Sequence, residues 1–344
     1  MFLMALPRAV ALRDVQMVNF TLRRCLNNVI RIALLLPAFA FCTSYAQNYP
    51  VRPVRVIVPS ATGGGMDTVG RGLSYKLSDM LGQSFVVDNR PGAGSVPALE
   101  ILAAAEPRGY TLLLVSGTTV VHPILYQSPY DIVRDFAPVS QVTSQGFMLV
   151  VHPSIGVKSP LDLVQYMRAN PGKLNYASAG TGTVLHMSGE LFQIATGTRM
   201  THIPFRGTGA AFTDLVSGRV QVSFPTIISS QGHVNAGRLR ALAVTSPKRV
   251  AAMPDLPTLS EAGVPGVVVV NWYGLIAPRL TPRDVIERIA TETAKAVRTP
   301  EMAKNLTDDG SEGVGSSPRE FAERIRADQM QWGKVIKQAG IRGE

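Results

Sequence analysis

The sequence predicts an α/β protein built as two lobes that are joined by two crossing strands. From residue 49 onward, short apolar runs rich in β-branched residues alternate with stretches whose apolar residues recur at helical spacing. This alternation is typical of parallel βαβ units. The segments at 147–151 and 267–278 are expected to carry the chain into the second lobe and back. With 344 residues, 46% hydrophobic and 17% charged, the chain is long enough for about two packed domains.

The first lobe is expected to begin with a buried strand at residues 54–58. Its Val-Arg-Val-Ile-Val sequence is short and β-branched, which fits a central parallel strand. A helix is expected over residues 68–81, with apolar residues at helical spacing and Gly82 at its end. The other elements expected here are strands at 85–87 and 111–115 and a helix at 97–105.

The second lobe repeats this alternation. Ser159 and Pro160 have the residue types of an N-cap and a first helical position, so a helix is expected from there to about residue 169. Strands are expected at 147–151, 174–177, 201–205, 220–224 and 239–244, and helices from the loop at 178–183 to about 196 and over 210–217. The C-terminal part is expected to be helical over 282–297, 301–306 and 318–339.

The first 46 residues have the pattern of a secretory signal peptide. Three arginines (23, 24 and 31) flank an apolar run at 32–41, and Ser44-Tyr45-Ala46 is a small-x-small cleavage sequence. A membrane anchor is the alternative, but the apolar run is shorter than a membrane span requires. Either Met1 or Met17 can be the start. We expect cleavage after Ala46, lobe 1 at residues 47–148 and 273–344, and lobe 2 at residues 149–272.

Charge and cysteine content narrow the function classes further. Cys25 and Cys42 both lie in the leader, so we expect no disulfide and no thiol chemistry in the mature chain. The formal net charge of +10 becomes +6 once the five arginines and one aspartate of the leader are removed. This mildly basic balance favours anionic small ligands, or it reflects only a solvated surface. No Lys/Arg run with interleaved aromatic residues occurs, which argues against nucleic-acid binding.

Four strand–loop–helix junctions share one chemistry. Each offers backbone N–H groups, and most add glycines or small hydroxyl residues; they lie at 59–67, 89–95, 178–183 and 205–209. Because ligands collect at the carboxyl ends of strands in open α/β sheets, these loops are expected to face one cleft. The unpaired N–H groups and the positive dipole end of a helix N-terminus favour an anion there. The loops therefore predict a site for a carboxylate or another small oxyanion.

Sharper motifs for nucleotides, metals and hydrolysis are missing. The dinucleotide fingerprint fails after Gly63 and Gly65, because Thr68 stands where the third glycine belongs, and no glycine is followed by the Lys-Ser or Lys-Thr of a P-loop. Neither H-E-x-x-H nor G-x-S-x-G occurs. We therefore expect a protein that is not an enzyme.

Several residues keep two interpretations. Asp67 is interpreted as a helix cap rather than a direct contact of an anion, since like charges repel. His186 either faces the cleft or is hydrogen-bonded to a neighbouring loop. Trp272 and Tyr273 either pack under the hinge or line the cleft. Arg90 either binds the ligand or donates to carbonyl groups in its turn.

The order of these motifs resembles a known family. The pattern includes Val58-Pro59-x-x-x-Gly63-Gly64-x-x-Asp67, Asn89-Arg90-Pro91-Gly92-Ala93-Gly94, Leu174-Asn175-Tyr176-Ala177-Ser178-Ala179-Gly180, Pro204-Phe205-Arg206-Gly207 and Trp272-Tyr273-Gly274. In this order, behind a signal peptide, it is similar to the extracytoplasmic solute receptors of tripartite tricarboxylate transporters, the Bug family. The resemblance spans essentially the whole chain from Tyr49 onward.

The resemblance implies a two-lobed periplasmic-binding-protein fold, type II-like, in which each lobe is a mixed sheet flanked by helices. It implies a monomeric periplasmic receptor that closes on a mono-, di- or tricarboxylic or aromatic acid and is then recognised by membrane permease subunits. Such binding needs no cofactor and no metal. A periplasmic sensor that signals to a membrane kinase is the alternative, and a secreted hydrolase is a third.

The resemblance also implies ligand-binding positions on both lobes. These are Ser60, Ala61, Gly65, Asp67, Ser116, Thr118, Ser178, Thr181, Thr183, His186, Phe205 and Gly207. The chain departs from the family at Pro225, where an acidic or amide residue commonly follows the phenylalanine. This argues against an amino-acid ligand whose ammonium group needs a carboxylate. The Ser60-Ala61-Thr62 run replaces a more usual phenylalanine-containing run.

Overall fold

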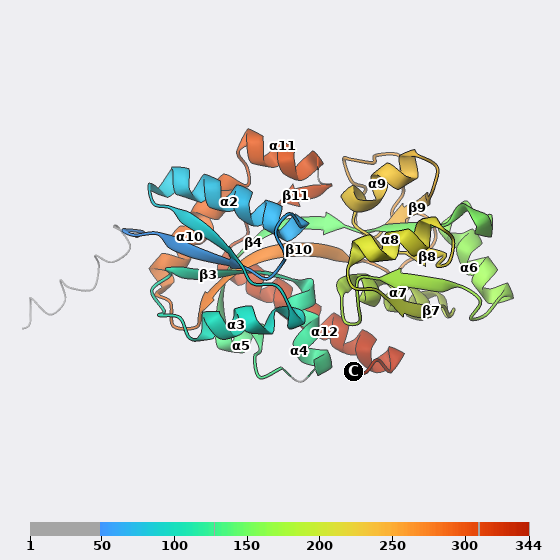
Figure 1. Ribbon diagram of the computed structural model, residues 1–344, viewed down its shortest axis with the longest axis horizontal. Helices are drawn as coiled ribbons and strands as arrows, with labels where there is room; N and C mark the ends of the chain where they lie inside the picture. The colour runs from blue at the N-terminus through green and yellow to red at the C-terminus, as the bar shows by residue number, and fades with distance from the viewer. Residues whose placement is uncertain (1–48, 127, 309, 344) are drawn as a thin grey trace, which may run out of the picture. The chain divides into compact units, whose positions relative to one another are not determined.

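Two mixed β-sheets organise the computed structural model, which describes residues 49–126, 128–308 and 310–343 (Figure 1). The chain from Pro50 onward forms one unit. The predicted signal peptide, its cleavage site and both cysteines lie outside the described residues. The predicted α/β class and two-lobed architecture are confirmed. None of the described helices is both long and apolar enough to span a membrane.

The first sheet has the strand order β11-β4-β10-β3-β1-β2. Its parallel part is β1 (Val54–Val58) between β2 (Phe85–Asn89) and β3 (Thr111–Ser116). The antiparallel part is β10 (Val270–Pro278) between β3 and β4 (Phe136–Gly146), with β11 (Ser311–Gly313) at the edge. The three parallel strands were predicted to within two residues, whereas β4 was not predicted. Its polar side chains are buried and bonded inside the protein, as for Ser140, whose Oγ donates to the carbonyl oxygen of Ser316 (2.7 Å).

Seven α-helices accompany this sheet in the described chain, together with the 3-10 turn η1 (Ala93–Ser95). They are α2 (Gly65–Leu81), α3 (Val96–Ala103), α4 (Gly117–Tyr126), α5 (Ile132–Asp135), α10 (Arg283–Ala296), α11 (Pro300–Asp308) and α12 (Pro318–Ala339). Gly82 ends α2 with φ 68°, as predicted. The helix begins at Gly65 rather than Thr68, because Gly64 takes the extended N-cap conformation. The apolar faces of strands and helices meet in a core that includes Ile57, Leu113, Phe136, Trp272 and Phe321.

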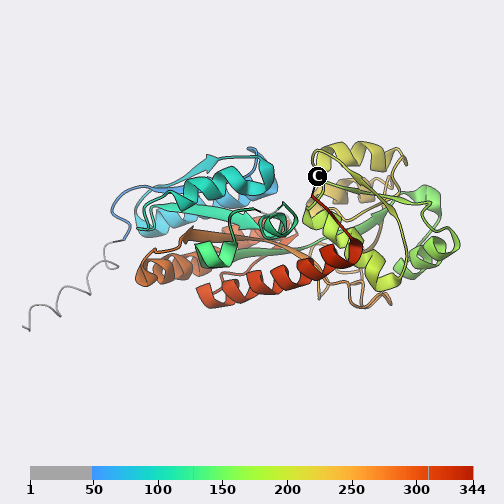
Figure 2. The same ribbon diagram turned by 90° about the horizontal axis from the view of Figure 1, so that it is seen from below.

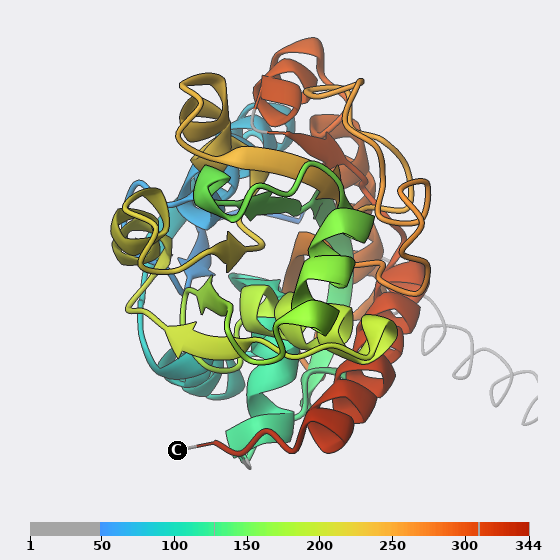
Figure 3. The ribbon, with the colours of Figure 1, turned by 90° about the vertical axis from the view of Figure 1, so that its right-hand side faces the viewer.

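The second sheet has the order β7-β6-β8-β5-β9. Its strands are β5 (Met148–Val151), β6 (Asn175–Ser178), β7 (Thr201–Pro204), β8 (Val222–Ser223) and β9 (Arg240–Val244). The accompanying helices are α6 (Pro160–Ala169), α7 (Val184–Thr196), α8 (Thr208–Val216) and α9 (Ile227–Asn235), with a 3-10 turn η2 (Pro153–Ile155). Helices α6 and α8 lie on opposite sides of this sheet (Figure 3). The predicted caps of α6 are confirmed, since Ser159 forms a capping box with Asp162 and Pro160 opens the helix.

The chain passes from one sheet to the other with almost no linker. β4 ends at Gly146 and β5 begins at Met148. A Cβ on Gly146 would lie 2.8 Å from the Ser246 Oγ, so only glycine fits this close passage. The return strand β10 buries Trp272, whose indole N–H donates to the Asp328 carboxylate of α12 (2.7 Å). Of the two interpretations of Trp272, packing under the crossing is therefore confirmed.

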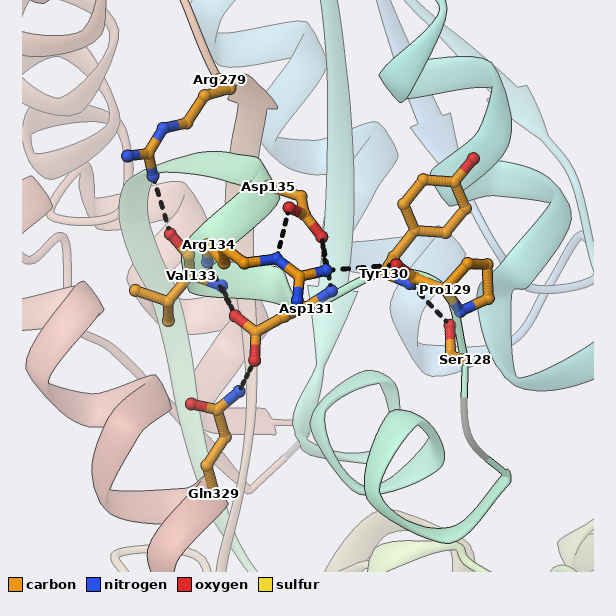
Figure 4. Close-up of polar contacts among 9 residues, drawn as sticks. All are labelled: Ser128, Pro129, Tyr130, Asp131, Val133, Arg134, Asp135, Arg279 and Gln329. Carbon is orange, nitrogen blue, oxygen red and sulfur yellow. Dashed lines mark hydrogen bonds and ion pairs between the residues drawn. The ribbon is translucent and has the colours of Figure 1, made fainter.

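Helix α12 packs against elements that belong to both sheets. It packs on β4, α4 and α7, and Trp332 and Val335 belong to the core of the second sheet (Figure 2). A polar cluster fixes the middle of the helix against α5 (Figure 4). One oxygen of Asp131 caps α5 by accepting the N–H groups of Val133 (2.9 Å) and Arg134 (2.7 Å), and the other accepts the amide of Gln329 (2.8 Å). The helix is thereby tied to the element that precedes β4.

Candidate functional site

Strand pairing brings the carboxyl ends of the parallel strands to the crossing. Tyr273, near the start of β10, pairs with Ser116, so β3 and its parallel neighbours β1 and β2 end at the edge where the chain leaves the first sheet. In the second sheet, Val150 pairs with Ser223, and Phe147 bridges Thr226. β6 runs parallel to β8, and β7 runs parallel to β6. The carboxyl ends of these three strands therefore lie at the edge where the chain enters the second sheet. All four predicted loops follow strands that end at these two edges.

The loop after β1 is held by a buried carboxylate. Asp67, at the third position of α2, is 2% exposed, and its Oδ2 accepts the N–H of Gly63 (2.9 Å). Gly63 has φ +86°, a left-handed conformation that glycine adopts without steric cost. Gly64 is the N-cap, so the prediction of Asp67 as an N-cap residue is wrong in position. Its carboxylate nevertheless shapes the turn at the helix N-terminus, and both of its oxygens are used inside the protein.

Asn89, from the predicted loop at 89–95, completes this arrangement, and its contact with the first loop was not predicted. Its side-chain amide donates to the Ser60 carbonyl oxygen (3.0 Å) and to the Asp67 Oδ1 (2.9 Å), while its Oδ1 accepts from Arg71 (2.9 Å). Arg71 also pairs with the Asp67 Oδ2 (2.9 Å). Burial alone would raise the pKa of Asp67, but hydrogen bonds from Arg71, Gly63 and Asn89 outweigh it and hold the pKa below its usual value. The carboxylate is therefore ionised at neutral pH.

The loop after β6 is closed by hydroxyl groups. Thr183 is the N-cap of α7: its Oγ1 accepts the N–H of His186 (3.4 Å) and donates to the Gly180 carbonyl oxygen (2.7 Å). The buried Ser178 Oγ lies 3.1 Å from both the N–H and the carbonyl oxygen of Gly180. Gly182, with φ +78°, donates its N–H to the Nδ1 of His186 (3.1 Å). Ser178, Thr183 and His186 therefore all bond to the loop itself.

His186 belongs to a buried aromatic cluster. The residue is 2% exposed, and its ring stacks on the ring of His202 at 3.8 Å and 6°. The His202 Nε2 lies 2.7 Å from the Ser178 Oγ, and the Tyr176 hydroxyl donates to Glu190. Burial, together with the neighbouring His202, lowers the pKa of His186 to about 3, and burial lowers the pKa of His202 to about 4. Of the two interpretations of His186, the structure shows the hydrogen bond to the neighbouring loop.

The other predicted positions lie on the same two edges. Ser116 ends β3, and its N–H donates to the Thr119 Oγ1 (3.2 Å); Thr118 is half-buried in the first turn of α4. Phe205 is half-buried and donates its N–H to the Ser178 carbonyl oxygen (3.1 Å). Gly207 caps α8 with φ +97° and donates to the Ala179 carbonyl oxygen (3.2 Å). Phe205 and Gly207 thus tie the fourth loop to the third.

The Arg90 side chain pairs with a carboxylate of β2. Its Nε forms an ion pair with the Asp88 carboxylate (3.1 Å), and Asp88 also pairs with Arg55. The predicted alternatives for Arg90, a ligand contact or a donor to carbonyl groups, therefore omitted its main partner. The pairing of β1 with β2 places Asp88 opposite Ile57 and next to Arg55.

Several hydrogen-bond donors remain open in both loops. Among the described residues, the N–H groups of Ala61 and Thr62 in the first loop have no hydrogen-bond partner, nor do those of Ala179 and Thr181 in the third. The Ser60 Oγ is buried and likewise has no partner in the described chain. Open N–H groups beside helix N-termini attract an anion through both hydrogen bonds and the helix dipole.

The fold and these loops define a two-lobed α/β solute-binding protein. Residues 69–341 match the family model described as tripartite tricarboxylate transporter family receptor, and the chain belongs to this family. Protein BugT of Bordetella pertussis is 32% identical over 300 residues, which cover 86% of this chain and 92% of BugT. The predicted resemblance to the Bug family is confirmed.

Solved structures of similar proteins include two that hold ligands. Rpa4515 of R. palustris, in a structure with adipate, has 34% identity and a TM-score of 0.76, with 86% of this chain and 99% of that chain covered. MatC (Rpa3494) from Rhodopseudomonas palustris, with bound malate, has 31% identity and a TM-score of 0.73, with 84% and 100% covered.

Proposed function

We propose that this protein is a periplasmic receptor that captures a small carboxylate between its lobes and delivers it to a tripartite tricarboxylate-type permease. The ligand is a mono-, di- or tricarboxylate or an aromatic acid. Its binding shifts an open–closed equilibrium about the two crossing strands. The protein acts as a monomer without cofactor or catalysis, after signal-peptide cleavage following Ala46.

One observation carries this proposal: two loops, one from each sheet, hold open N–H donors at helix N-termini on the edges where the chain crosses. In the first loop these donors belong to Ala61 and Thr62, and in the third to Ala179 and Thr181. Both loops are fixed from behind by buried acceptors, Asp67 and His186. Donors held in place before the ligand arrives bind it without a further cost of ordering.

The predicted site residues divide into two roles in this proposal. Ser60, Ala61, Gly65, Thr118 and Thr181 offer a hydroxyl group or an open backbone to the ligand. The remaining positions hold the loops in shape: Asp67, Ser116, Ser178, Thr183, His186, Phe205 and Gly207. Lobe 1 consists of residues 47–148 and 273–344 and lobe 2 of residues 149–272. Because similar proteins carry adipate and malate, dicarboxylates are the first ligands to test.

A thermal-shift panel tests the proposal. The mature chain is mixed with adipate, malate, citrate and benzoate, and with neutral sugars and amines at matched ionic strength. We expect at least one acid to raise the melting temperature, with a shift that grows as its concentration rises above Kd. At a hundredfold excess over Kd, the ligand stabilises the folded state by about 2.7 kcal/mol. Stabilisation by a sugar or an amine and by none of the acids contradicts the proposal.

A further inference from the structure

The two ligand loops are built on the same turn, although their sequences differ. In each, a glycine in the left-handed region precedes the helix N-cap: Gly63 at φ +86° before Gly64, and Gly182 at φ +78° before Thr183. In each, the N–H of that glycine is accepted by the side chain four residues later, at the third helical position. The acceptors are the Asp67 Oδ2 at 2.9 Å and the His186 Nδ1 at 3.1 Å. His186 is the positional counterpart of Asp67.

The two acceptors differ in charge and in what surrounds them. The Asp67 carboxylate is balanced by the Arg71 guanidinium at 2.9 Å. Among the described residues, no such cation is paired with His186: the groups that face it are His202 of β7, Tyr176 of β6 and Glu190 one turn further along α7. Within the described residues, Glu190 has no ion pair with lysine or arginine. A carboxylate at position 186 would therefore stand uncompensated behind the third loop.

A hydrogen bond fixes the tautomer of the His186 imidazole. Because the His186 Nδ1 accepts from Gly182, its ring proton is on Nε2, which lies 3.8 Å from a Glu190 oxygen. The neighbouring His202 contacts the Ser178 Oγ through its Nε2 at 2.7 Å, and its ring is stacked on that of His186 behind the loop. His186 is therefore a neutral Nε2–H imidazole.

We propose that His186 is a positioning residue: its neutral imidazole does for the third loop what the Asp67 carboxylate does for the first, and its lack of charge keeps that loop receptive to an anion. This inference rests on the proposed carboxylate-binding function. The open N–H of Thr181 is one residue from Gly182, so a negative charge on the Gly182 acceptor acts directly on the anion that Thr181 would bind.

A matched pair of substitutions separates shape from charge. In His186→Asn, the amide oxygen can accept the Gly182 N–H without charge; in His186→Asp, an oxygen of nearly the same reach carries a negative charge. Calorimetric titration uses whichever acid of the panel gives the largest thermal shift. We expect His186→Asn to bind within about threefold of the wild type and His186→Asp to bind at least about tenfold more weakly than His186→Asn, with a larger gap at low salt. Equal affinities of the two variants overturn the inference.

A second measurement needs no variant and no ligand. Nitrogen-15 spectra of the wild-type imidazoles at pH 7 are expected to show an unprotonated Nδ1 and a protonated Nε2 for His186. A protonated Nδ1 overturns the inference even if a variant fails to fold. If the wild type binds no acid in the panel, the proposed function fails, while these spectra still decide whether His186 holds the loop as a neutral acceptor.

Discussion

The loops after β1 and β6 reach the same backbone geometry through different chemistry. The first uses a carboxylate that gathers donors from Gly63, Arg71 and Asn89. The third uses a neutral imidazole that accepts one N–H and is otherwise held by stacking on His202. The turn therefore requires a glycine and an acceptor four residues later, and not a particular charge. The charge of the acceptor side chain can therefore differ between the loops, according to the ligand that the loop binds and the cations nearby.

Acidification should distinguish the two loops most strongly. The folded pKa values of about 3 for His186 and about 4 for His202 lie below the ordinary value of 6.5. The unfolded chain therefore takes up protons first, and the histidine contribution to stability, complete above pH 6.5, is lost as the pH falls toward 4 and then 3. At about 1.4 kcal/mol for each unit between the two pKa values, His202 alone accounts for about 3 kcal/mol.

The measurement compares urea unfolding of the wild type and the His186→Asn/His202→Gln double variant between pH 7 and 4. Glu190 faces the histidine pair, and burial raises its pKa, so its protonation opposes the loss in the lower part of this range. Tyr176 faces the pair too, but burial raises its pKa, so it stays protonated throughout. Both groups remain in the double variant. The free energy of unfolding should fall more steeply in the wild type; parallel curves would show that the pair is not buried and neutral.

Asp67→Asn should have a smaller effect, about 2 kcal/mol of unfolding free energy, because the hydrogen bonds lost are to a charged acceptor. The single oxygen of the introduced amide can still accept from Gly63 and Arg71. Its NH₂ group then lies against the NH₂ group of Asn89, so the 2.9 Å hydrogen bond from Asn89 to the Asp67 carboxylate is lost. Asp79→Asn is the matched control: it lies on the exposed side of the same helix, and surface substitutions usually change stability by less than about 0.5 kcal/mol. Chemical denaturation of both variants checks this. A loss at Asp67 no larger than at Asp79 contradicts the role given to the carboxylate.

The sequence predicted the fold class and most strand and helix positions because apolar periodicity is a local signal. It failed at β4, where buried Ser140, Gln141 and Thr143 interrupt the apolar pattern and are satisfied by partners distant in sequence or on the same strand. Helices α4 and α9 were missed as well. Pro123 lies inside α4, and polar Ser229, Ser230 and Gln231 dilute the apolar pattern of α9.

The candidate loops were predicted for the same reason, since glycine-rich turns after strands are visible locally. The positions of Asn89 and His202 were not, because each depends on strand pairing. Asn89 meets the first loop only through its register opposite Val58, and His202 meets His186 because β7 lies beside β6. The repeated glycine-x-x-x-acceptor spacing at Gly63 and Gly182 was readable, and would have predicted that Asp67 and His186 share a role.

The central claim, that the first loop binds a carboxylate through its backbone, is tested most directly by calorimetric titration of Gly65→Val. A Cβ at Gly65 lies 3.4 Å from the Tyr273 hydroxyl, an ordinary contact, so the fold tolerates it while the side chain covers the loop backbone. Gly232→Val is the control, an exposed helical glycine with no atom near its Cβ. We expect Gly65→Val to lose at least about a hundredfold in affinity, equivalent to about 2.7 kcal/mol, while Gly232→Val binds as the wild type does. Unchanged binding by Gly65→Val would contradict the account.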